Sequence, residues 1–131
     1  MDLLKIFKGD PAGVRSSHLK NLITVAMADG ELESREWDLL VNIARILGAS
    51  ESEIKLVQEH PESVKFIPPK RYDDKVQQIR DLVAMMTIDG HINPHEIELC
   101  KKIALHLDIL PRIVDDIVSH DRPEAAELQR N

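Results

Sequence analysis

The feature that most constrains this chain is an internal repeat. When the sequence is shifted by sixty residues, its two halves align at many apolar and turn positions. The matched pairs are Leu22/Leu82, Ile23/Val83, Ala26/Met86, Asp29/Asp89, Gly30/Gly90, Leu32/Ile92, Glu36/Glu96, Leu39/Leu99, Ile43/Ile103, Ala44/Ala104, Leu47/Leu107, Ile54/Val114 and Val57/Ile117. Such self-similarity decides the architecture before any local pattern does. We therefore expect one supersecondary unit, used twice.

Each repeat carries apolar residues at helical spacing. Leu19, Leu22, Ile23 and Ala26 recur every three or four residues and predict one apolar helix face. We expect Ser16 or Ser17 to cap this helix, which would be about twelve residues long and end at Asp-Gly.

Two further helices complete each unit. In the first unit Gly48 ends the second helix, and Ser50 with Glu53 forms a capping box that opens the third. In the second unit Asn93 caps a helix that begins at Pro94 and runs to about Asp108, and Pro111 opens the last one.

The chain is expected to form a single domain, residues 1–131. Unit one spans about 16–59, a proline-containing linker spans 60–70, unit two spans about 71–119, and a polar tail covers 120–131. The fold class is all-α, a compact bundle of about seven helices with a pseudo-two-fold relation between the units. The few aromatic residues leave aliphatic side chains and Met to fill the core.

The two Asp-Gly turns are the candidate functional site. In an EF-hand loop, Asp29 and Asp89 would be position 5, Gly30 and Gly90 position 6, and Glu36 and Glu96 position 12. Positions 1 and 3 then fall on Val25 and Met27, and on Met85 and Thr87. Because two carboxylates are missing from each loop, the pattern argues against a high-affinity calcium site.

Turn and cap chemistry accounts for the same residues. Glycine takes a positive φ at low cost, and Asp side chains accept hydrogen bonds from turn amides. Asn93 and Glu96 predict a capping box. Glu33 and Glu36 occupy the same two positions in the first unit but match the capping-box pattern less well. Weak divalent-ion binding at Asp29, Glu36, Asp89 and Glu96 remains the alternative, and His91 and His95 would suit a transition metal.

An "A-x-x-D-G-x-[IL]-x-x-x-E" helix pair, duplicated and followed by "IA-x-x-L", resembles the tellurite-resistance TerB-like family. That family includes the N-terminal domain of the co-chaperone DjlA. The resemblance covers about Ser17 to Val118 and implies a compact helical domain, a binding or scaffolding role in stress or tellurite resistance, and metal binding at the acidic motif positions. Unit two departs from the pattern at Ile88 and His91.

These features favour a non-enzymatic interaction module that binds a protein partner, with no catalytic residue and no cofactor beyond a divalent metal ion. A dedicated metal-binding or sensing domain is the alternative, and an uncharacterised small enzyme is the second. A net charge of -6 with no basic patch argues against nucleic-acid binding. The single Cys and the lack of a long apolar run predict a cytoplasmic protein without a membrane span. The apolar segment Leu3–Phe7 would dock on the domain or lie on a membrane surface.

Overall fold

The computed structural model describes residues 10–28 and 30–121, and within them the backbone is helical with no strand. These residues form six α-helices and one short 3-10 helix. In chain order they are α2 (Pro11–Ala26), α3 (Ser34–Leu47), α4 (Glu51–Glu59), η1 (Pro61–Ser63), α5 (Tyr72–Thr87), α6 (Pro94–His106) and α7 (Arg112–Asp121). The all-α prediction is confirmed for this part of the chain, whereas the predictions for Leu3–Phe7 and most of the polar tail fall outside it.

The first helix begins earlier than the sequence analysis predicted. Asp10 is its N-cap, with Oδ1 accepting a hydrogen bond from the Gly13 N–H at 3.0 Å, and Pro11 fills the first helical position. The prediction of a cap at Ser16 or Ser17 is therefore wrong. Ser17 is buried inside the helix, where its hydroxyl accepts a hydrogen bond from the Ile67 N–H.

The predicted ends of the next helices are largely correct. Gly48 follows α3 in the left-handed region at φ 83°, and Ser50 caps α4 by accepting from the Glu53 N–H. The side chain of Glu53 does not return to its own cap. It instead receives both Nε and Nη2 of Arg15, at 2.7 and 2.8 Å, and so joins α4 to α2.

The second half repeats the order of helix lengths. Helices α2, α3 and α4 have 16, 14 and 9 residues, and α5, α6 and α7 have 16, 13 and 10. Asn93 caps α6 at Pro94 as predicted, but the helix ends at His106, and α7 begins one residue after Pro111. Between the halves, the predicted linker begins with the short 3-10 helix η1.

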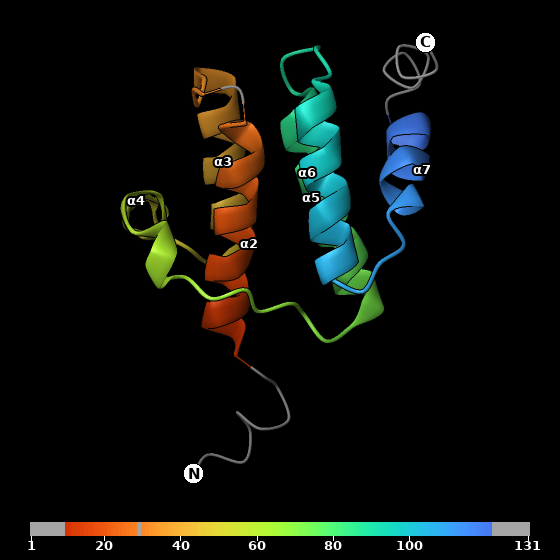
Figure 1. Ribbon diagram of the computed structural model, residues 1–131. Coiled ribbons are helices and arrows are strands. Elements are labelled where there is room, and N and C mark those ends of the chain that lie inside the picture. The colour runs from red at the N-terminus through yellow and green to blue at the C-terminus, as the bar shows by residue number, and fades with distance from the viewer. Residues whose placement is uncertain (1–9, 29, 122–131) are drawn as a thin grey trace.

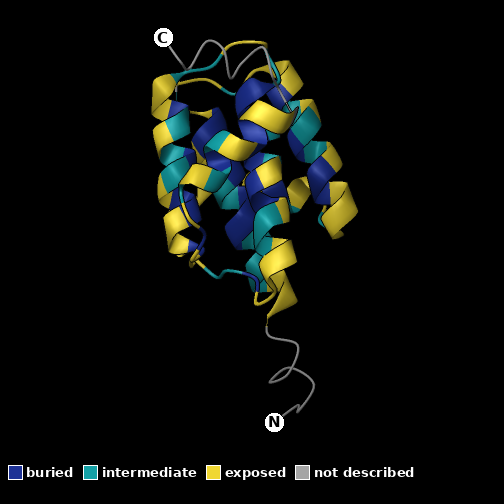
Figure 2. Ribbon diagram, turned by 90° about the vertical axis from the view of Figure 1, so that its right-hand side faces the viewer, coloured by how far each residue is buried: buried dark blue, intermediate teal, exposed yellow. Residues whose placement is uncertain are grey.

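Helices α2 and α5 lie at the centre of the bundle. Helix α2 packs against α3, α4, α5 and α6, and α5 also contacts α3, α6 and α7 (Figure 1). Their inward faces are buried and their outward faces exposed, and both halves contribute to one core (Figure 2). None of the helices in the described ranges combines the length and apolar character needed to cross a bilayer.

Candidate functional site

Both Asp-Gly turns lie at the same end of the bundle, where α2 leads into α3 and α5 leads into α6 (Figure 1). Gly30 and Gly90 have φ values of 102° and 82°, as the turn prediction requires. A Cβ added at either glycine would meet no atom within 4 Å, so backbone conformation and not crowding explains the glycines. The two turn glycines therefore share the same left-handed backbone region.

In the first turn Glu36 acts as a capping residue. Its side chain is only 3% exposed, and its Oε1 accepts a hydrogen bond from the Glu33 N–H at 3.0 Å. This is one arm of the capping box, although sequence analysis rated the first turn as the poorer match. Asp29, the other predicted metal ligand of this turn, lies outside the described residues. The position of Glu36 thus favours cap chemistry over metal coordination in this half.

The second turn uses different groups for the same purpose. Asp89 Oδ1 accepts a hydrogen bond from the His91 N–H at 3.0 Å, which makes the compact turn that sequence analysis predicted. Asn93 Oδ1 accepts from the His95 N–H at 2.8 Å and caps α6. Glu96 is only 6% exposed and lies in the first turn of that helix.

The two turns share one cleft of about 470 Å³. It is lined by Glu33 of the first turn and by Asp89, His91, Ile92, Asn93, Pro94 and Glu96 of the second. The structure thus brings Asp89 and Glu96 to one surface, while Glu36 does not line it. Sequence analysis named Glu33 as a poor cap but did not include it among the four predicted site residues. Its equivalence to Asn93 at the cap position was the available signal, because both residues stand three after the turn glycine.

Metal coordination by the four predicted carboxylates stays a prediction. Among residues 10–28 and 30–121, no group of three or more His, Cys, Asp and Glu side chains is arranged to hold a metal ion. Because Asp29 is not among those residues, the full predicted set cannot be assembled from the described groups.

Cys100 follows Glu96 by one helical turn and is fully buried. Burial, and then the nearby charge of Glu96, raises the pKa of the Cys100 thiol to about 12. The thiol is consequently protonated at neutral pH, and a protonated buried thiol is a poor nucleophile and metal ligand. Cys100 is therefore a residue of the hydrophobic core.

Comparison with known proteins adds no further identification. No protein-family profile, curated protein or solved structure matches this chain.

Proposed function

We propose that this protein is a non-enzymatic helical binding module that receives a basic side chain of a protein partner in the cleft between its two Asp-Gly turns. The observation that carries the proposal is the convergence of Glu33, Asp89 and Glu96 on that cleft. None of the described residues lining it is Lys or Arg. A cationic group entering the cleft would therefore meet carboxylates from both halves of the molecule.

Electrostatics favours a cation as the ligand. Carboxylates gathered around one cavity repel one another, and an opposite charge relieves that repulsion. Charge-assisted hydrogen bonds to Lys or Arg are stronger than neutral ones, and a guanidinium can bridge two carboxylates. The net charge of -6 also attracts basic partners over distance.

We further propose that the two halves are a duplicated unit with a pseudo-two-fold relation, as in TerB-like proteins. Support comes from burial at positions sixty apart, where Leu22, Leu40 and Ile54 match the buried Leu82, Cys100 and Val114. The resemblance also suggests the setting, a bacterial stress or tellurite-resistance system. The single cysteine is the reason for placing the protein in the cytoplasm.

A metal-binding or sensing domain is the second candidate. It is favoured by the same convergence of carboxylates, since hard divalent ions take oxygen ligands. The buried, cap-bonded carboxylate of Glu36 argues for the protein-partner proposal, because that group is already used by its own helix.

The proposal can be tested by following backbone amides while a trilysine peptide is added to metal-free protein. We expect saturable shifts at Glu33, Gly90 and His91. Glu33→Gln and Asp89→Asn should each weaken binding about fivefold, because one partly exposed charge pair contributes about 1 kcal/mol. Glu98→Gln removes an exposed carboxylate of α6 that does not line the cleft, so it should leave the affinity unchanged. Equal effects of all three variants would overturn the assignment to this cleft.

A parallel titration with Mg²⁺, Ca²⁺, Mn²⁺ and Zn²⁺ separates the two candidates. Saturable shifts at Gly30 and Gly90 that disappear in Asp29→Asn or Asp89→Asn would establish the metal-binding function instead. Amides that stay unchanged at millimolar ion, together with saturable trilysine binding, would support the protein-partner function.

A further inference from the structure

A second cleft lies away from the Asp-Gly turns, beside the first turns of α2. Its volume is about 530 Å³, and it runs between α2, α4 and the linker that follows η1. The apolar part of its lining consists of Ala12, Leu56, Val57, Val64 and Ile67. Leu56 is 60% exposed, whereas the core of the described chain buries five leucines, Leu19, Leu22, Leu40, Leu82 and Leu107. An exposed leucine that lines a cleft beside other apolar side chains gives another apolar group a place to pack, while Asp10, Glu53 and Lys65 make the rest of the lining polar.

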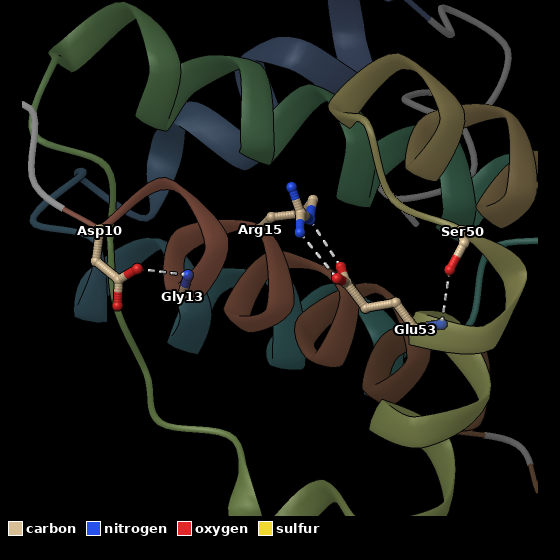
Figure 3. Close-up of polar contacts among 5 residues, drawn as sticks. All are labelled: Asp10, Gly13, Arg15, Ser50 and Glu53. Atoms are coloured by element: carbon tan, nitrogen blue, oxygen red, sulfur yellow. Dashed lines mark hydrogen bonds and ion pairs between the residues drawn. The ribbon is translucent and has the colours of Figure 1, made fainter.

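The walls of this cleft are held in place by specific contacts. Arg15 of α2 and Glu53 of α4 face each other in a two-pronged ion pair, and Asp10 closes the first turn of α2 beside them (Figure 3). On the other side, the linker is fastened to α2, because Ser17 accepts from the Ile67 N–H and Lys20 Nζ donates to the Val64 carbonyl. The cleft is therefore a fixed feature of the fold.

The segment of the chain that directly precedes this cleft is a suitable occupant for it. Asp10 is the first described residue, and it lines the cleft itself. Nine residues precede it, and they include the apolar segment Leu3–Phe7. Leu3, Ile6 and Phe7 have the i, i+3, i+4 spacing that lets three side chains share one face. Phe7 is only three residues from Asp10, a reach of about 10 Å at full extension.

We propose that this cleft is the binding site for the chain's own Leu3–Phe7 segment, which packs its apolar side chains against Leu56 and the neighbouring apolar wall. Covalent attachment at the cleft gives the segment an effective concentration on the order of millimolar. A segment of another molecule would have to compete with that concentration. The inference is independent of the proposed function, since no lining residue is shared between the two clefts.

A spin label placed by Lys5→Cys in the full-length protein tests the inference. Cys100 needs no replacement, because its buried thiol with a pKa of about 12 does not react with labelling reagents at neutral pH. We expect the label to abolish the amide signals of Leu56 and Val64, which are remote from Lys5 in sequence, and reduction of the label to restore them. A label placed by Ser119→Cys, at an exposed position on α7, should leave both signals intact, because α7 packs on α5 and α6 and lies on the opposite side of the bundle from α4 (Figure 1).

Two variants and a mixing experiment complete the test. Leu56→Glu should restore the signals of the neighbouring cleft residues, whereas Leu110→Glu, at a similarly exposed leucine elsewhere, should not. Signals of Leu56 and Val64 that persist beside the Lys5→Cys label would overturn the inference. So would signals lost when the spin label is carried only by a second, isotopically unlabelled copy, because the occupant would then be the segment of a partner molecule.

Discussion

His18 is the most unusual buried polar group in the described chain. Its side chain is 1% exposed, and Nε2 lies 2.8 Å from Asp81 Oδ2 on α5. Nδ1 is buried and has no hydrogen-bond partner among the described residues. Asp81 is 19% exposed and is also held through Oδ1, which accepts from Gln77. The pair joins the central helices of the two halves through a polar side-chain contact.

Truncation of this imidazole should destabilise the whole fold. His18→Ala removes the hydrogen bond and leaves a cavity, so we expect the free energy of unfolding to fall by about 2–3 kcal/mol. Asp81→Asn keeps an oxygen that can accept from Nε2–H and should cost about 1 kcal/mol. Urea unfolding followed by circular dichroism measures both. A loss below about 0.5 kcal/mol for His18→Ala would contradict this role for the pair.

Sequence analysis did not predict the burial of His18, because it placed the start of this helix too late in the chain. A helix that starts at Ser16 or Ser17 would place His18 in its first turn instead of its middle. The true start at Pro11 moves His18 to the middle of the helix. The Asp10-Pro11 pair is the sequence pattern that indicates this helix start, because Asp is favoured at the N-cap and Pro at the first helical position. The contact with Asp81 could not be predicted from the sequence, because Asp81 lies 63 residues away from His18.

The ends of α3 and α6 are built alike from different residues. Ala49 donates to the Ala44 carbonyl and Gly48 to the Arg45 carbonyl, and the same two bonds recur at Ile109 and Asp108. This is the Schellman pattern, whose left-handed residue is usually glycine. Gly48 has φ 83°, but Asp108 adopts φ 61° with a side chain present. The two helix ends therefore share one backbone geometry, although the left-handed residue is glycine in one and aspartate in the other.

The two positions should respond in opposite directions to substitution. Gly48→Ala forces a Cβ into the left-handed region and should lower the free energy of unfolding by about 1 kcal/mol. Asp108→Gly removes such a cost and should raise stability by up to about 1 kcal/mol. Thermal unfolding of the two variants and the double variant measures the effects. Since nothing lies within 4 Å of a Cβ at Gly48, a larger loss there would have to come from an unrecognised contact.

Most helix caps whose partners are neighbours in sequence were predicted correctly, and the Asp10 cap of α2 was the exception. Ser50, Gly48, Asn93 and Pro94 were assigned correctly because each acts within its own turn. The predicted hydrogen bond from the Ser50 N–H to the Glu53 side chain was wrong. Arg15 binds the Glu53 carboxylate from another helix instead. The candidate site follows the same rule. The Asp-Gly turns were visible in the sequence, but the cleft that joins Glu33 to Asp89 appears only when both turns meet in space.

The packing of the whole molecule predicts that its halves unfold together. Helix α2 of the first half contacts α5 and α6 of the second, and α3 contacts α5. Leu22 and Leu82 are each fully buried in the one core that these helices enclose. Neither half can cover its apolar face without the other, so a cavity in one half should weaken both.

Trp37 allows this cooperativity to be measured, because it is the only tryptophan and reports on α3 of the first half. Leu82→Ala lies in the other half and should lower the free energy of unfolding by about 3 kcal/mol. Its effect on the unfolding midpoint should be equal whether Trp37 fluorescence or circular dichroism is recorded. Leu22→Ala is the matched variant in the first half and should behave in the same way. If Leu82→Ala left the fluorescence midpoint in place while the circular dichroism transition split, the halves would be independent units. A shared core would then not be what holds them together.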